Sequence, residues 1–236
     1  MAKAIKAYHA KHPFHFGITT GDNFYYESFP SPDDPRWKIS WVNQYQSLGI
    51  PFYISLGNHD WYEPAGPISE VIYSRTSKSW KLPAYYYTYT AGDAQFFAIN
   101  TNALTDKQLT WLREELAKSK ARWKIVYGHF PVYEQMSDYT EPQQRLLLPM
   151  FKEFGVDLYL CGHHHTMQHW TVDGIEYLVT GAGGMINYPL NDSTKTGRKF
   201  MMSAPGFAAV EVTHDVMTFR FIGAKDQILY EYRRKK

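Results

Sequence analysis

Four apolar, strand-like segments of this sequence end at a glycine that is followed at once by polar residues. Ligands of α/β sheets bind beyond the carboxyl ends of the strands, and glycine lets the backbone turn sharply there. The pattern therefore predicts one sheet edge at which Asp, Asn and His side chains gather. The four segment ends are Gly21-Asp22-Asn23, Gly57-Asn58-His59-Asp60, Gly128-His129 and Gly162-His163-His164-His165.

Short apolar runs rich in β-branched and aromatic residues predict buried strands between stretches with helical spacing. Alternating strands and helices indicate the α/β class, and 236 residues fit a single domain. Successive strands with a turn near Gly223 are expected over 207–232. The earlier strands are predicted at His15–Thr19, Pro51–Leu56, Phe96–Ile99, Trp123–Tyr127, Val156–Cys161 and Ile175–Thr180.

Three helices are expected. One covers Ala2–Ala10. A second begins at Thr105, which has capping-box spacing to Gln108, and continues through Leu109, Leu112 and Leu116. The third passes through Leu147, Phe151 and Phe154 and ends at Gly155, and Pro149 is expected to kink or split it.

Composition excludes several classes of function. The net charge of +2 gives no reason to expect nucleic acid or an anionic membrane as the main partner. The single cysteine, Cys161, allows no internal disulfide. No run of about 18 apolar residues is present, so no membrane span is expected.

Carboxylate, amide and imidazole groups at one sheet edge suit a metal site. A carboxylate such as Asp22 can bridge two metals, and a metal pair can activate water for in-line attack on phosphorus. One Gly-His or Gly-Asp pair carries no information. The ordered series of four, each after a strand, is a strong signal.

The series resembles that of the calcineurin-like metallophosphoesterases. Within them it is similar to the small, tartrate-resistant purple acid phosphatases, because Tyr25 follows Asp22 by three residues. The resemblance extends roughly from Ala4 to Tyr230. Further family-like segments are 72–74, 81–83, 108–112 and 180–184.

This resemblance implies a four-layer αββα sandwich and a dinuclear centre of Fe(III) plus a divalent Fe, Zn or Mn. Asp22 would bridge the metals, Tyr25 and His165 would bind the ferric ion, and His59 would protonate the leaving group. Asp60 would orient His59. The divalent ion would be bound by Asn58, His129 and His163.

Other interpretations of these residues stay open at this stage. Asn58 alone is a common turn residue, and most of the 19 tyrosines should lie in the core. His163 and His165 alternate along an extended segment and so face the same side, whereas His164 points away and is expected to be structural.

The sequence departs from the family in three places. The family begins with a strand ending in Gly-Asp-x-Gly that supplies another iron ligand, but residues 1–21 contain no Asp or Glu. We expect either a chain truncated at its N-terminus, with a groove of unpaired backbone, or a variant with a weakened iron site in which His9, His12 or His15 would be the substitute ligand. Asp138 replaces a histidine of the mammalian-type enzymes, and the stretch from Asn100 to Thr105 is short.

The expected activity is hydrolysis of phosphate monoesters at mildly acidic pH by metal-activated hydroxide. The substrate would be a small phosphate ester or a phosphoprotein. The alternatives are a phosphodiesterase or phosphoprotein phosphatase of the same superfamily, or a non-catalytic scaffold. Only the resemblance suggests a secreted or lysosomal location, and the sequence is silent on oligomeric state.

Overall fold

The computed structural model describes residues 1–25, 28–135, 140–185, 187–190 and 195–236. Within these ranges the strands form three sheets, of which the largest has the order β10-β8-β9-β7-β6-β5-β4. Its strands are β4 (Tyr87–Ala91), β5 (Ala94–Ala98), β6 (Trp123–Tyr127), β7 (Leu158–Cys161), β8 (Met167–Val172), β9 (Ile175–Thr180) and β10 (Arg198–Met202).

The two smaller sheets contain three strands each among the described residues. In one, β1 (Gly17–Thr20) pairs in parallel with β2 (Phe52–Ser55), which pairs in parallel with β3 (Trp80–Lys81). The other is an antiparallel meander of β11 (Gly206–Val212), β12 (Val216–Gly223) and β13 (Ile228–Lys235).

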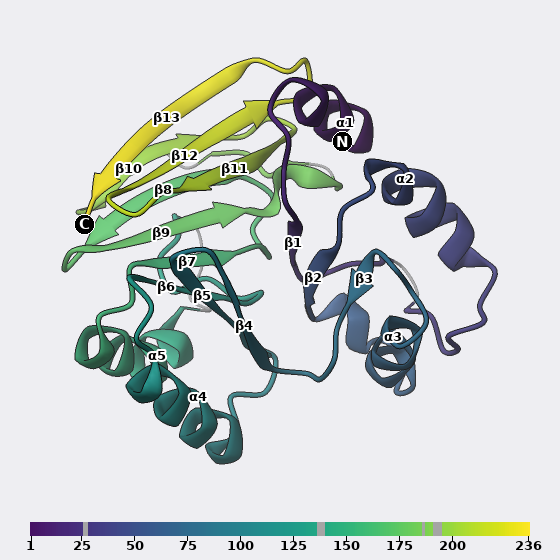
Figure 1. Cartoon of the computed structure of the whole chain (residues 1–236), viewed down its shortest axis with the longest axis horizontal. Helices are drawn as coiled ribbons and strands as arrows, with labels where there is room; N and C mark the ends of the chain where they lie inside the picture. Colours follow the sequence, from purple (N-terminus) through teal and green to yellow (C-terminus); the bar gives the residue numbers. More distant parts are fainter. Residues whose placement is uncertain (26–27, 136–139, 186, 191–194) are drawn as a thin grey trace.

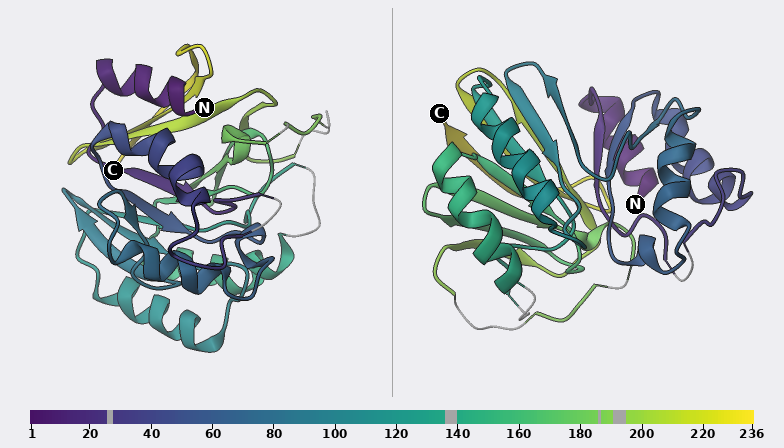
Figure 2. Two further views of the ribbon diagram at one scale, coloured as in Figure 1. Left: turned by 90° about the vertical axis from the view of Figure 1, so that its right-hand side faces the viewer. Right: turned by 90° about the horizontal axis from the view of Figure 1, so that it is seen from below.

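Helices cover the outer sides of the sheets (Figures 1 and 2). Helices α4 (Asp106–Lys118) and α5 (Glu141–Phe154) pack on the seven-stranded sheet through a buried cluster that includes Leu112, Leu116 and Phe151. On the opposite side lie α1 (Ala2–Lys11), α2 (Asn43–Tyr45) and α3 (Gly66–Ser74).

A second, larger apolar cluster fills the space between the sheets. It joins Ile54 and Trp80 of the smaller parallel sheet to Ile125 and Leu158 of the large sheet and to Phe219 of the meander. The molecule is thus an α/β structure of four layers with sheets inside and helices outside, as the sequence predicts.

The predicted strands agree with the observed ones to within two residues at each end, and 123–127 and 175–180 agree fully. Helix α5 continues through Pro149, so the predicted split is wrong. The proline ring is on the exposed face, while Leu147, Met150 and Phe151 on the buried face anchor the helix to the sheet.

The predicted capping box at α4 is only half formed. The Thr105 side chain accepts a hydrogen bond from the backbone N–H of Gln108, at 3.3 Å. The Gln108 amide does not return this bond, because it pairs with the backbone of Asn100 and Ala103. Gln108 therefore fastens the strand end after β5 to the helix.

No helix in the described part of the chain is long and apolar enough to cross a membrane.

We expect Phe151→Ala to lower the free energy of unfolding by about 3–5 kcal/mol, because it leaves a cavity between α5 and the sheet. Phe151 is fully buried, so the site beyond the strand ends should keep its geometry. Denaturant titration measures the loss. As a control, Ile39→Ala removes an exposed side chain and should change stability by about 0.5 kcal/mol or less. Equal effects of the two substitutions would contradict the packing assigned to α5.

Candidate metal centre

Two glycines allow the loops after β1 and β2 to touch. Gly21 has φ 86°, and a Cβ there would lie 2.6 Å from the Gly57 nitrogen and 2.6 Å from His129 Nδ1. A Cβ on Gly57 would overlap the backbone nitrogen and the carboxylate of Asp22. Only glycine permits this approach, which brings Asp22 beside the Asn58-His59 segment.

Two candidate ligands lie on unusual backbone. Asp22 has φ 52° and His163 has φ 60°, in the left-handed region that residues other than glycine rarely adopt. Such conformations persist when the surroundings fix them, and they concentrate at functional sites. Both residues lie directly after a glycine that ends a strand segment.

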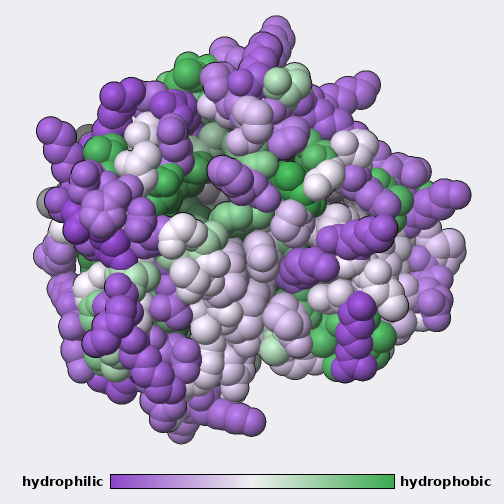
Figure 3. All heavy atoms as spheres, in the orientation of Figure 1, coloured by the Kyte–Doolittle hydropathy of each residue, from purple (hydrophilic) through white to green (hydrophobic). Residues whose placement is uncertain are grey.

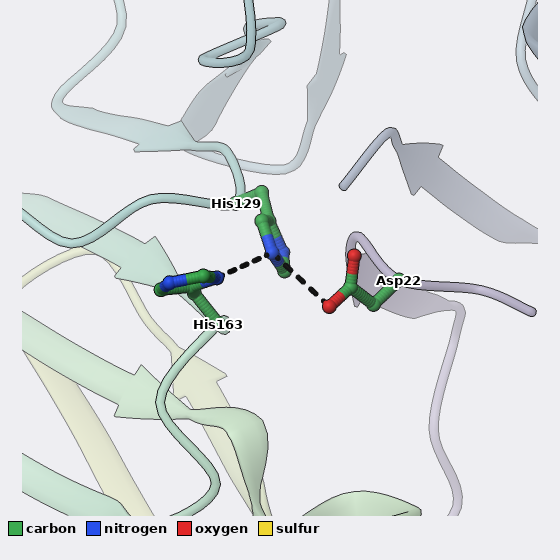
Figure 4. Close-up of side chains that lie close together, drawn as sticks. All are labelled: Asp22, His129 and His163. Carbon is green, nitrogen blue, oxygen red and sulfur yellow. Dashed lines mark hydrogen bonds and ion pairs between the residues drawn. The ribbon is translucent and has the colours of Figure 1, made fainter. Parts of the chain in front are cut away.

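Asp22, His129 and His163 meet at one point, with ligand atoms that all lie within 4.8 Å of one another (Figure 4). His129 Nε2 is 3.3 Å from Asp22 Oδ2 and 3.1 Å from His163 Nδ1. The Asn58 side-chain oxygen joins them, at 3.0 Å from His129 Nε2 and 3.2 Å from His163 Nδ1. Strand ends of two sheets therefore bring four predicted ligands together.

The tautomer of His129 shows why this group suits a cation. Its Nδ1 lies 2.8 Å from the backbone oxygen of Thr20, which can only accept, so Nδ1 carries the hydrogen. In the neutral imidazole the lone pair of Nε2 then faces the Asp22 and Asn58 oxygens. If His163 Nδ1 also carries no hydrogen, four acceptor atoms meet here, and a metal ion would satisfy all of them.

Burial tunes these groups further. Burial and the neighbouring charge of His129 lower the pKa of His163 to about 4, so its imidazole is neutral at mildly acidic pH and one ring nitrogen can bind a metal. Burial opposes ionisation of Asp22. When His129 is protonated, its hydrogen bond and charge, with the His59 amide, nevertheless hold the Asp22 pKa below its usual value.

Tyr25 and His165 form a second group next to Asp22. The Tyr25 hydroxyl is 2.8 Å from His165 Nε2 and 3.3 Å from Asp22 Oδ2. Burial and the Asp22 charge raise the pKa of Tyr25. A phenolate at this position therefore needs a strongly charged cation beside it, and the donor set of phenol, imidazole and carboxylate suits such an ion.

His59 lies between two tyrosines at the edge of the site. Its ring centroid is 4.5 Å from that of Tyr25 and 4.5 Å from that of Tyr62, and its backbone N–H donates to Asp22 Oδ1 at 2.9 Å. Its Nε2 is 3.4 Å from the Tyr62 hydroxyl. The ring is thus held beside the ligand group and is not part of it.

Asp60 does not orient His59 as the sequence analysis predicted. The fully buried carboxylate instead accepts hydrogen bonds from the backbone N–H groups of Gly57 at 2.7 Å, Asn23 at 2.9 Å and Phe24 at 3.3 Å. Asp60 therefore fastens the loop after β1 to the loop after β2, directly behind Asp22.

Sequence reasoning missed Glu70, which completes this network from α3. It is fully buried, and Asn23 Nδ2 lies 3.3 Å from its Oε2 and 3.1 Å from Asp60 Oδ2. Burial and the charge of Asp60 raise the pKa of Glu70 well above its usual value, so Glu70 holds a proton beside Asp60. The sequence offered one signal for this buried acid, which is a glutamate among the mostly apolar residues of 66–74.

Other residues lie around the centre. Tyr188, also missed, stacks on His165 with a centroid distance of 4.5 Å. His164 is buried away from the ligand group, with Nε2 3.7 Å from Glu134 and Nδ1 3.2 Å from Thr166. Asp138 lies outside the described residues.

This fold and this cluster define a metallophosphoesterase. Residues 1–167 match the model of the Calcineurin-like phosphoesterase family, and the chain belongs to that family.

Its relatives are acid phosphatases. The chain is 32% identical to Purple acid phosphatase 17 of Arabidopsis thaliana, over 94% of this chain and 75% of that protein. It is 26% identical to Tartrate-resistant acid phosphatase type 5 of Homo sapiens, over 92% of this chain and 78% of that protein. The resemblance to tartrate-resistant purple acid phosphatases is thereby confirmed.

Two solved structures share the fold. One is a Plasmodium protein described as "GAP50 the anchor in the inner membrane complex", with TM-score 0.82 and 22% identity over 99% of this chain and 82% of that chain. The other is the purple acid phosphatase PPD1 of yellow lupin, with TM-score 0.75 and 14% identity over 99% of this chain and 48% of that chain.

The proton on Glu70 gives a testable pH dependence. Because the folded chain binds this proton more tightly than the unfolded chain, the free energy of unfolding should fall as pH rises above the ordinary value of 4.5. Glu70→Gln keeps a donor beside Asp60 and removes the titration. The variant should therefore gain stability relative to the wild type as pH rises, by up to about 1.4 kcal/mol per pH unit. Denaturant titrations between pH 4.5 and 7 measure this.

The control is Glu63→Gln, at an exposed glutamate of the same region, whose stability curve should run parallel to that of the wild type. A parallel curve for Glu70→Gln as well would show that Glu70 is ionised in the folded protein.

Proposed function

We propose that this protein hydrolyses phosphate monoesters at mildly acidic pH with a dinuclear metal centre. The observation that carries the proposal is that two groups of possible ligands meet at Asp22 Oδ2. His129, at 3.3 Å from this oxygen, lies with His163 and Asn58. Tyr25, also at 3.3 Å from it, lies with His165. One bridging carboxylate between two donor groups suits two neighbouring metal ions.

The two donor groups differ in chemistry, which supports different metals. The phenol of Tyr25 with the His165 imidazole favours a ferric ion. The neutral imidazoles of His129 and His163, with the Asn58 oxygen, suit a divalent Fe, Zn or Mn. When bound, such a pair would polarise the phosphoryl oxygens and lower the pKa of water.

His59 is the proposed general acid. Its ring is fixed beside Tyr25 and Asp22, and the described residues offer no hydrogen-bond partner to its buried Nδ1. A histidine so placed can contact the phosphate and protonate the leaving alkoxide. The substrate class is a small phosphate ester or a phosphoprotein. Tyr25 argues against the phosphodiesterase alternative, because a tyrosine ligand is the mark of the purple acid phosphatase type.

The test is turnover together with the metal content of the purified chain. The wild type should contain about two metals per chain, iron among them, and should hydrolyse an alkyl phosphate such as glycerol phosphate. His59→Ala should keep both metals and lose about 10²–10⁴-fold in kcat on this substrate, because the alkoxide leaves poorly without a proton. On p-nitrophenyl phosphate, whose leaving group needs little protonation, the loss should be smaller.

His214→Ala, at a histidine whose side chain is 64% exposed, is the matched control and should retain full activity. If His59→Ala lowered kcat by the same factor on both substrates, His59 would not be the general acid. A loss of metal would instead make His59 a ligand.

A second prediction concerns the ferric side. The iron-loaded wild type should absorb visible light through charge transfer from Tyr25, and Tyr25→Phe should abolish the band because no phenolate remains. Absorption spectra and elemental analysis measure this, and the divalent metal should stay bound in the variant. Tyr62→Phe, at a tyrosine that also touches His59, is the control and should keep the band. A band that survives Tyr25→Phe would contradict the assignment.

A non-catalytic scaffold is the second candidate. Two observations support it. The predicted ligand set supplies only three described donors on the ferric side, those of Asp22, Tyr25 and His165. The chain also shares its fold with the Plasmodium anchor protein. A chain that keeps its circular dichroism spectrum, binds no added iron or zinc and hydrolyses neither ester would establish this candidate and exclude the phosphatase.

A further inference from the structure

The ring of His59 lacks the acidic partner that was expected to orient it. Asp60, the expected partner, is engaged by backbone N–H groups of two loops. The Nδ1 atom of His59 is buried and has no hydrogen-bond partner among the described residues. The His59 backbone N–H donates to Asp22, which places the residue but does not fix its ring. If His59 is to deliver a proton to one oxygen, another group must hold the ring.

Tyr62 is placed beside this ring by the turn that follows β2. Residues His59–Trp61 form one turn of 3₁₀ helix, and the Tyr62 N–H donates to the His59 carbonyl oxygen at 3.3 Å. Side chains three residues apart lie one above the other in such a turn. The next residue is anchored too, since the Glu63 N–H donates to the Ser28 hydroxyl at 2.8 Å. The backbone therefore fixes the position of Tyr62 next to His59.

The side chain of Tyr62 contacts His59 in two ways. Its ring centroid is 4.5 Å from that of His59, as is the centroid of Tyr25, so two phenol rings restrict the imidazole. The Tyr62 hydroxyl lies 3.4 Å from His59 Nε2, in a contact that is exposed to solvent. Because Nδ1 is buried, Nε2 is the ring nitrogen that a substrate can reach. The hydroxyl thus lies at the nitrogen that would carry the transferred proton.

The exposure of Tyr62 is not explained by packing. Of the tyrosines that the structure describes, only Tyr62 and Tyr188 are exposed. Each of them contacts a histidine of the site. Tyr62 is 55% exposed and so gains little from the burial that usually favours aromatic residues. Figure 3 shows a more usual distribution on one face, with hydrophilic residues around the rim and hydrophobic ones around a central hollow. The contact with His59 accounts for the exposed ring.

We propose that Tyr62 is the positioning residue of His59. Its ring limits rotation of the imidazole, and its hydroxyl holds Nε2 on the exposed side, where a substrate oxygen can approach. Tyr62 thus has the role that the sequence analysis gave to Asp60. The effect on catalysis rests on the proposed function, in which His59 is the general acid. The ordering of the ring does not depend on that role.

The first test is the effect of Tyr62 on turnover by the metal-loaded chain. Tyr62→Leu should lower kcat on glycerol phosphate about 10- to 100-fold, because a misplaced acid transfers its proton poorly. Tyr62→Phe keeps the ring and loses only the hydroxyl, so its kcat should fall about 2- to 10-fold. On p-nitrophenyl phosphate, whose leaving group needs little protonation, both variants should stay within about twofold of the wild type. KM and metal content should not change.

The second test is a double-mutant cycle, which shows whether Tyr62 acts through His59. In a chain that already carries His59→Ala, adding Tyr62→Leu should lower kcat no further, because the group that Tyr62 positions is gone. The matched control is Tyr85→Leu, at a half-buried tyrosine whose ring contacts Trp61. This control should keep the kcat of the wild type. An equal loss from Tyr62→Leu with and without His59 would overturn the proposal.

The third test needs no activity. NMR relaxation of the whole, metal-free chain with isotope-labelled histidine measures the order parameter of the His59 ring. The ring should be about as rigid as ordered backbone, with a value near 0.85, and Tyr62→Leu should lower this value below about 0.6. Tyr85→Leu should leave the value unchanged, and equal unfolding midpoints would show that all variants fold. A His59 ring that stays rigid in Tyr62→Leu would refute the proposal.

The positioning role and the general-acid role can fail separately. If His59→Ala keeps full kcat on glycerol phosphate while Tyr62→Leu frees the ring, the general-acid role fails and the positioning of the ring is supported. If His59→Ala loses activity but Tyr62→Leu changes neither kcat nor the order parameter, His59 is the acid and Tyr62 does not position it. A loss from Tyr62→Leu by one common factor on both substrates would also contradict the positioning role.

Discussion

The carboxylate of Asp22 is the contact on which the site depends. One oxygen accepts the His59 backbone N–H at 2.9 Å, and the other faces His129 at 3.3 Å and Tyr25 at 3.3 Å. It therefore joins strand ends from two different sheets. The backbone conformation of Asp22 is unfavourable for a residue with a side chain, and it persists because Gly21 and Gly57 allow the neighbouring loops to close around it.

Behind this contact, a pair of buried carboxyl groups stabilises the loops and never meets the proposed substrate. Asp60 accepts three backbone N–H groups from the two loops, and Glu70 shares the side chain of Asn23 with it. Burying two acids is unfavourable unless one is protonated and both are hydrogen-bonded. The arrangement links the position of α3 to the position of Asp22, so the core and the site are fixed by the same groups.

The sequence predicted most of the fold because its apolar runs match buried strands closely. It also predicted which strand ends carry the polar residues now found around Asp22. It erred where a side chain had two candidate partners: Gln108 binds the Asn100 segment and not the helix start, and Asp60 binds backbone amides and not His59. Spacing along the chain cannot decide between partners that tertiary packing brings equally close.

The sequence by itself indicated metal-dependent chemistry on phosphate esters, because the types of ligand side chain and their order after the strands are local properties of the chain. Only the tertiary structure decided the protonation and pairing of these groups. The tautomer of His129 depends on the Thr20 oxygen, and the proton of Glu70 depends on burial against Asp60. Electrostatics and hydrogen bonding act through space, so neither could be derived from residue spacing.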